Sequence, residues 1–252
     1  MNRRQLNILL LLLMVLVLAG CNVQNPPPIG PDATGFWDKY FVWPLSWLII
    51  ESSMFLGENY GLGILVATII IRLLILPLMI KQIKSSKMMQ ALQPEMQKIR
   101  EKYKNDPQKA QQETMLLFQK HNVNPLAGCL PLLVQMPILI AFYHAIIRTP
   151  EIKTHTFLWM SLGEKDPYYI LPIIAAATTY LQSKMMGSAT QNNPQMQMML
   201  VMMPLMILAI AVTLPSALSL YWVYGNIFTI IQTYFLYREK GTELKPKEGT
   251  AK

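Results

Sequence analysis

The sequence is poor in charge and in groups that could carry out chemistry. Only 14% of its 252 residues are charged, whereas 52% are hydrophobic, and it contains two cysteines and three histidines. This apolar content exceeds what a soluble domain of this size needs, so the composition predicts an integral membrane protein. The two cysteines, Cys21 and Cys129, lie in very different contexts, and we therefore expect no disulfide.

The long apolar segments contain no aspartate or glutamate, and the sequence shows no HExxH zinc motif and no glycine-rich phosphate loop. An enzyme that worked inside a membrane would need a reactive set of this kind. We therefore expect no catalytic residues, no metal and no cofactor beyond a covalent lipid. The energy sources that remain are the burial of apolar surface in lipid and the membrane potential.

The N-terminus has the features of a processing signal. Two arginines precede an apolar run at 8–19 that is too short to cross a bilayer core of about 30 Å. The following Leu18-Ala19-Gly20-Cys21 resembles a lipobox, which implies a lipoprotein signal peptide at 1–20 and a diacylglyceryl group on Cys21. The proline-rich segment 21–35 would then be an extended, lipid-anchored tether outside the cell. An ordinary uncleaved anchor is the alternative interpretation.

Five apolar segments are each long enough to form a membrane-spanning helix. They lie at about 60–80, 125–147, 168–185, 198–214 and 218–237. The segment between the first two spans is strongly basic, and positively charged loops stay in the cytoplasm. This rule places the processed N-terminus outside and the basic tail at 239–252 inside, as in a multi-pass protein of a bacterial cell membrane.

Two helical elements are expected outside the membrane. Aromatic residues crowd into 36–57, which predicts an amphipathic helix along the outer interface, bent at Pro44. Within 82–122, Asp106-Pro107 provides a helix start, and an apolar seam predicts an antiparallel cytoplasmic helical hairpin. That seam consists of Met89, Leu92, Met96, Ile99 and Tyr103. The predicted fold is an all-α integral membrane protein with five transmembrane helices, this hairpin and the outer interfacial helix.

Arg72 lies deep inside the first predicted span, where a charged side chain costs about 3 kcal/mol on insertion scales. Because no other predicted span contains a carboxylate, a water-filled cavity between the helices would best accommodate the charge. Five further polar or amphipathic residues of the predicted spans could line that cavity: Thr68, Gln135, Gln182, Trp222 and Asn226. For Gln135, Asn226 and the threonine, ordinary hydrogen bonds between helices are an equally good interpretation.

A positive, hydrated recess facing the cytoplasm would attract an acidic, unfolded segment. It would also lower the cost of moving polar groups through hydrocarbon. The polar residues of the spans therefore favour a protein that helps other chains to cross the membrane. An anion channel or a small-solute transporter is the alternative, since a polar recess with one arginine could also select anions. A structural subunit of a larger complex is a third interpretation, which an unchanged Arg72→Ala variant would favour.

Several long motifs are distributed in order over the five predicted spans. They are Ile71-Arg72-Leu73-Leu74-Ile75-Leu76-Pro77-Leu78, the run from Met88 to Met96, Asn124-Pro125-Leu126-Ala127-Gly128-Cys129, Gln135-Met136-Pro137, Asp166-Pro167-Tyr168-Tyr169-Ile170-Leu171-Pro172, and the stretch from Leu220 to Asn226. Together they resemble the YidC/Oxa/Alb family of membrane protein insertases. The lipobox and the absence of a large outer domain resemble the short forms of single-membrane bacteria.

The resemblance implies a membrane protein insertase and chaperone whose five-helix core covers 58–238. Such a protein would insert nascent membrane proteins from the ribosome, alone or with the Sec translocon. The resemblance also implies a groove open to cytoplasm and lipid, in which Arg72 supplies the charge, Thr68 and Gln182 line the wall, and Trp222 touches clients. The hairpin would receive clients, and the tail would meet the ribosome.

Overall fold

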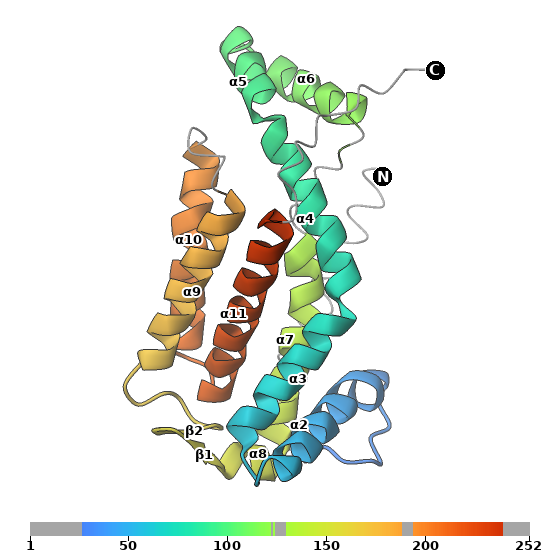
Figure 1. Ribbon diagram of the computed structural model, residues 1–252, viewed down its shortest axis with the longest axis vertical. Helices are drawn as coiled ribbons and strands as arrows, with labels where there is room; N and C mark the ends of the chain where they lie inside the picture. Colours follow the sequence, from blue (N-terminus) through green and yellow to red (C-terminus); the bar gives the residue numbers. More distant parts are fainter. Residues whose placement is uncertain (1–26, 122, 124–129, 188–193, 239–252) are drawn as a thin grey trace.

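Helices account for nearly all of the chain that the computed structural model describes, which is residues 27–121, 123, 130–187 and 194–238 (Figure 1). In chain order the elements are η1 (Asp38–Val42, a π-helical turn), α2 (Trp43–Phe55), α3 (Tyr60–Leu74), α4 (Leu76–Ala91), α5 (Gln93–Lys102), α6 (Pro107–Lys120), α7 (Leu130–Arg148), α8 (Pro150–Thr154), β1 (Thr156–Phe157), β2 (Met160–Ser161), α9 (Ile170–Gly187), α10 (Pro194–Ala211) and α11 (Ser216–Arg238). The predicted helical fold is confirmed, with one addition, because β1 and β2 pair as a short antiparallel hairpin. The signal peptide expected at 1–20, both cysteines and the tail at 239–252 lie outside the described residues.

The central helix of the bundle is α11. It packs against α3, α7, α9 and α10, while α2 packs against α3 and α7 (Figure 1). The loop before α9 fixes the first turn of α11. Ser216 donates its N–H to the carbonyl oxygen of Glu164 at 2.7 Å and its hydroxyl to that of Ser161 at 2.5 Å. These bonds hold the start of α11 beside the β-hairpin.

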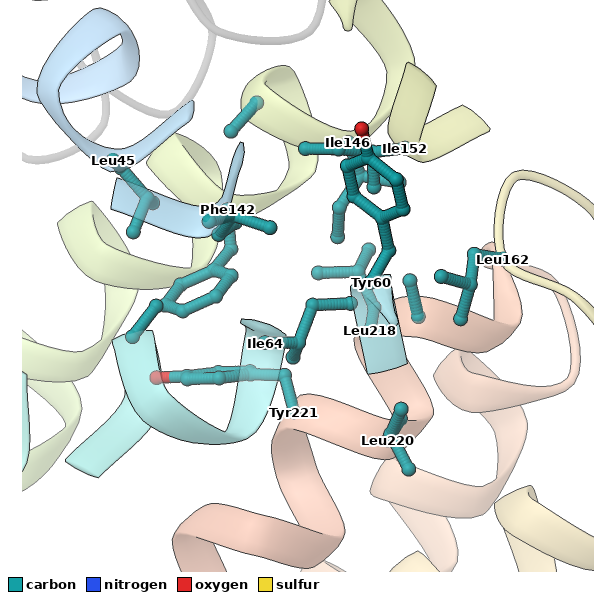
Figure 2. Close-up of a cluster of buried hydrophobic side chains, with 14 of the residues drawn as sticks. Leu45, Tyr60, Ile64, Phe142, Ile146, Ile152, Leu162, Leu218, Leu220 and Tyr221 are labelled. Carbon is teal, nitrogen blue, oxygen red and sulfur yellow. The ribbon is translucent and has the colours of Figure 1, made fainter. Parts of the chain in front are cut away.

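The main hydrophobic core lies at the end of the bundle nearest the β-hairpin. Most of its residues come from the first halves of α3, α9 and α11 and from the second half of α7, and η1, α2, α8, β2 and α10 contribute the others together with the loop before α9. Ile64, Phe142 and Leu218 are buried there, from three different helices (Figure 2). The opposite halves of the same helices contribute few side chains to this core, so polar groups in those halves are not enclosed by it.

The first predicted span, 60–80, is not one helix. It is divided at Ile75, where α3 and α4 meet with a bend of 61°. Pro77 explains the break, because its ring lacks an N–H and clashes with the preceding turn of a continuous helix. Pro94 produces a second break, between α4 and α5, which the sequence pattern did not lead us to predict. The prediction of an uninterrupted first span was wrong, and Arg72 lies in the last turn of α3.

The helical hairpin predicted at 82–122 is formed by α5 and α6, which pack together at the far end of α4 (Figure 1). Asp106 caps α6 by accepting a hydrogen bond from the backbone N–H of Lys109 at 3.0 Å, which confirms the predicted helix start. The hairpin has a small hydrophobic core of its own. That core consists of Leu92, Met96, Leu117, Phe118 and Val123.

The described end of the predicted tether, 21–35, is bound to the end of α7. Ile29 donates its N–H to the carbonyl oxygen of Arg148 at 3.0 Å, and the Arg148 Nε donates to the carbonyl oxygen of Pro27 at 2.9 Å. The Arg148 guanidinium also forms an ion pair with Asp38 at 2.8 Å. One buried arginine therefore holds both the tether and η1 against the bundle.

The helix expected at 36–57 is formed by η1 and α2, and aromatic side chains are exposed on its outward face. Trp47 and Phe55 are exposed on it, whereas Ser46 and Ser53 are buried. Ser46 is hydrogen-bonded to the hydroxyl of Thr149 at 2.6 Å. The helix predicted over 36–57 is thus present as η1 and α2, whereas its position along the outer interface stays a prediction. Exposed aromatic side chains of this kind suit contact with lipid headgroups.

Close packing of α2 on α3 depends on Gly63. A Cβ built there would lie 2.7 Å from the carbonyl oxygen of Ile49 and would overlap the hydroxyl of Ser53. We expect Gly63→Ala to lower the free energy of unfolding by about 1–3 kcal/mol, because the fixed backbone of α2 would have to move. Thermal unfolding in detergent measures the effect as a lower Tm. Gly30→Ala, where a Cβ meets no atom within 4 Å, is the control, and equal Tm values would contradict the close packing.

Large apolar side chains are exposed on α3, α9, α10 and α11. They include Ile69, Leu73, Ile173, Leu181, Val201, Leu205, Ile227 and Ile231. Apolar exposure on this scale is unusual for a soluble protein and typical of a surface that contacts lipid. By length and composition, no single helix within the described ranges passes as a membrane span, although the bent pair of α3 and α4 does so together.

Candidate functional site

Arg72 is half-buried in the last turn of α3. Its Nη2 donates a hydrogen bond to Oε1 of Gln135 on α7 at 3.5 Å. Arg72 belongs to the last turn of α3, where the partial negative charge of a helix C-terminus favours a cation by about 0.3–1 kcal/mol. The helix break caused by Pro77 thus makes the cation less costly at this position.

Gln135 extends the contact to α11. Its Nε2 donates to the hydroxyl oxygen of Tyr221 at 2.6 Å. The buried Tyr221 ring also stacks on Phe142, with ring centroids 4.1 Å apart (Figure 2). This amide orientation satisfies both neighbours, since a guanidinium only donates hydrogen bonds and a hydroxyl can accept one. A polar chain of Arg72, Gln135 and Tyr221 therefore joins α3, α7 and α11 at the edge of the hydrophobic core.

Gly225 lies one helical turn after Tyr221 on α11 and contacts the same arginine. A Cβ built at this glycine would lie 3.3 Å from Cζ and 3.4 Å from Nε of Arg72, and closer still to Nη2. The guanidinium therefore lies against the backbone of α11, in space that glycine leaves free. We call Gln135, Tyr221 and Gly225 the arginine seat.

The charge of Arg72 is not neutralised by its surroundings. Its contacts are with an amide and with helix backbone, and no carboxylate of the described residues forms an ion pair with it. By contrast, the buried Arg148 has Asp38 as its ion-pair partner. A half-buried cation with neutral partners keeps its attraction for an external anion, whereas a structural ion pair has lost it.

Thr68, Trp222 and Gln182 take positions outside the arginine seat. Thr68 is buried and donates its hydroxyl to the carbonyl oxygen of Ile64 in its own helix at 2.6 Å. Trp222 is half-buried and packs against the main core. Gln182 is half-buried on α9, and its Oε1 is enclosed without a hydrogen-bond partner in the part of the chain that the structure describes.

Asn226 joins α11 to α9. The side chain is buried, and its Nδ2 donates to the hydroxyl oxygens of Thr178 at 3.0 Å and Thr179 at 2.8 Å. These bonds match the alternative interpretation given to this residue, an ordinary hydrogen bond between helices. The structure thus brings two of the six predicted groove residues, Arg72 and Gln135, into direct contact.

Tyr221 and Gly225 were not among the predicted groove residues, although both lie in the motif from Leu220 to Asn226. A tyrosine beside Trp222 is easily taken for an interfacial aromatic residue, and a glycine has no side chain to suggest a role. Their spacing of four, on the face of α11 that meets α3, was the available signal. That spacing indicates a role for the two residues only once the contact of Arg72 with this face of α11 is known.

The site suits reversible binding. A guanidinium has several N–H donors, and those not bonded to Gln135 can engage a carboxylate or a peptide carbonyl. Within the described ranges there is no group of three or more His, Cys, Asp or Glu side chains that could hold a metal. The neutral partners of Arg72 supply no general base for bond-making chemistry.

Comparison with known proteins agrees with this picture. A family model described as 60Kd inner membrane protein matches residues 51–243. The membrane protein insertase MisCA of Bacillus subtilis (strain 168) is 58% identical over 249 residues, which cover 96% of this chain and 94% of that protein. The membrane protein insertase YidC 2 of Bacillus anthracis is 58% identical over 242 residues, covering 94% and 93%.

The fold is also similar to that of a solved structure, a crystal structure of an active YidC insertase with its first transmembrane domain resolved. The two agree with a TM-score of 0.65 at 29% identity over 88% of this chain, which spans 50% of the longer solved chain. The chain therefore belongs to the YidC/Oxa/Alb family and is a membrane protein insertase, a multi-pass protein of the bacterial cell membrane and not an enzyme.

Proposed function

We propose that this insertase admits its clients through a positively charged, hydrophilic groove that is bordered by α3, α7, α9 and α11 and opens to cytoplasm and lipid. One observation carries the proposal: Arg72 is half-buried and bonded to neutral groups, and no carboxylate of the described residues is paired with it. Water solvates such a cation when no client is present, and a client carboxylate can replace that water at low cost.

The groove would act on a client by attraction and by hydration. An acidic segment about 4 Å from the guanidinium gains about 1 kcal/mol in water-like surroundings and more in drier ones. Local water also lowers the cost of moving unpaired backbone groups through the hydrocarbon region. Burial of the client's apolar helix in lipid, beside the exposed apolar faces of the bundle, would then make insertion favourable.

We assign the wall of the groove to Thr68, Gln135, Gln182, Trp222 and Asn226. Gln182 is half-buried, and its enclosed Oε1 has no hydrogen-bond partner among the described residues, so a rotation of the side chain would let this oxygen accept a hydrogen bond from a client N–H. Trp222 offers a partly exposed aromatic surface to apolar clients. Thr68 and Asn226 are buried, so they would shape the wall through their helices without touching the client.

The proposed topology has five spans, formed by α3 with α4, and by α7, α9, α10 and α11. The helical hairpin and the β-hairpin lie at opposite ends of the bundle, which suits opposite sides of a membrane (Figure 1). The many basic residues of the helical hairpin favour the cytoplasm, and they would receive clients there. The tail would meet the ribosome, the Sec translocon would share larger clients, and a lipid on Cys21 would anchor the N-terminus outside.

The purified chain in liposomes provides the test. A single-span client with an acidic outer tail is released from ribosomes, and the fraction of tails protected from external protease is measured. We expect wild type to protect the tail well above empty liposomes, and Arg72→Ala to protect it about fivefold less, the loss expected for one hydrated ion pair.

Lys165→Ala is the matched control, since it removes an exposed positive charge from the loop before α9. We expect this variant to protect the client as wild type does. Equal protection by Arg72→Ala and wild type would contradict the groove. Anion conductance without any client protection would instead support the channel interpretation.

A further inference from the structure

We infer that Gly225 is a positioning residue for client binding, because it reserves on α11 the space in which the Arg72 guanidinium lies. The inference rests on the proposed function, in which the charge of Arg72 attracts clients. It concerns a different question, namely what keeps that charge at one place in the groove.

An arginine side chain in a hydrated recess has many rotamers, and its charge could sweep through several ångströms. The structure restricts it from two sides. The amide of Gln135 binds Nη2 from α7, and the backbone at Gly225 supports the flat guanidinium from α11. Tyr221 fixes the amide in turn through a bond of 2.6 Å. The charge is thus held where α3, α7 and α11 meet.

Alanine at position 225 would remove this support. The three atoms nearest to the added Cβ all belong to the guanidinium group of Arg72, namely Nη2, Cζ and Nε. They are the far end of a flexible side chain, so the arginine would move while the helices stay in place. Its bond to Gln135, already 3.5 Å long, would be lost in the process.

The effect of this glycine on the position of the Arg72 charge can be measured separately from its effect on stability. Gly225 lies inside α11, and alanine favours a helix more than glycine does. A residue that mattered only for packing would lose stability when enlarged. Here the enlarged residue should leave stability unchanged or raise it while the charge is displaced.

The experiment compares Gly225→Ala with wild type in the full-length chain in liposomes. Protease protection is measured for two clients that differ only in an acidic or a neutral outer tail, and Tm is measured in detergent. We expect the preference for the acidic tail to fall about fivefold, the factor for one weakened ion pair. Protection of the neutral tail and Tm should not fall. Gly30→Ala, with open space around the added Cβ, is the matched control.

The second arm repeats Gly225→Ala in an Arg72→Lys background. Lysine keeps the charge but has no atoms at the Nη2 position, so the added methyl group should change the preference less than twofold. An equal fall in both backgrounds, or an unchanged preference in Gly225→Ala alone, would overturn the inference. Failure of Arg72→Ala to alter the preference would instead overturn the proposed function, so the two failures are distinguishable.

Discussion

Replacing Arg72 by glutamate is expected to reverse the client preference of this insertase. Wild type should insert a client with an acidic tail better than one with a basic tail, and Arg72→Glu should do the opposite. Removing the attraction costs about 1 kcal/mol in water-like surroundings, and the new repulsion costs about as much again. The acidic client should therefore lose about 30-fold relative to wild type, and the same liposome assay measures the loss as the ratio of protected tails.

Arg72→Lys is the matched control because it keeps the charge while giving up the planar group. It should retain the acidic preference to within about threefold. Tm values in detergent should accompany each variant, since glutamate also lies unfavourably at the C-terminus of α3. If Arg72→Glu lowers insertion of acidic and basic clients equally while Tm holds, then the charge of residue 72 does not select clients.

Helix positions could be predicted from the sequence far better than helix breaks. Asp106 marked the start of α6 because an acid before proline caps a helix through purely local bonds. Pro77 was equally visible, but it lies within an apolar run, and the hydropathy that indicated a single span outweighed it. Pro77 explains why the helix breaks, whereas the size of the bend, 61°, also depends on how α3 and α4 pack against other helices.

The functional site could likewise be predicted only in part from the sequence. Arg72 could be selected because an isolated charge in an apolar run is costly wherever the chain folds. Gln135 was selected for similar reasons and does contact it. Tyr221 and Gly225 could not be found in this way, since their roles depend on α11 facing α3, a long-range relation. Asn226 was selected for polarity, yet its bonds lead to α9.

A second large effect is expected at Asp166, on the opposite end of the bundle from the helical hairpin. Its carboxylate is buried and accepts hydrogen bonds from Nε1 of Trp159 at 3.0 Å and from the backbone N–H of Tyr168 at 3.1 Å and of Leu171 at 2.7 Å. It thereby caps α9 and closes the loop before it. That loop also binds the first residue of α11, through Glu164.

Asp166→Ala would leave three donors without the acceptor that the buried carboxylate provides. Each net loss of a bond to a charged group is about 1.5–3 kcal/mol, and partial relaxation of the loop would recover some of it, so we expect about 3–5 kcal/mol of lost stability. Unfolding in detergent should show a Tm well below that of wild type. Asp32→Ala, at an exposed aspartate, is the control and should leave Tm unchanged.

Asp166→Asn distinguishes the contribution of the oxygen acceptor from that of the negative charge. The amide keeps one oxygen acceptor but turns an NH₂ group toward donors, so about half of the loss should remain. The start of α11 depends on the same loop, and a displaced α11 would carry Tyr221 and Gly225 away from Arg72. We therefore expect Asp166→Ala to weaken the acidic-tail preference even at temperatures where the bundle stays folded. A lower Tm with an unchanged preference would show that the loop stabilises the fold without setting the position of α11.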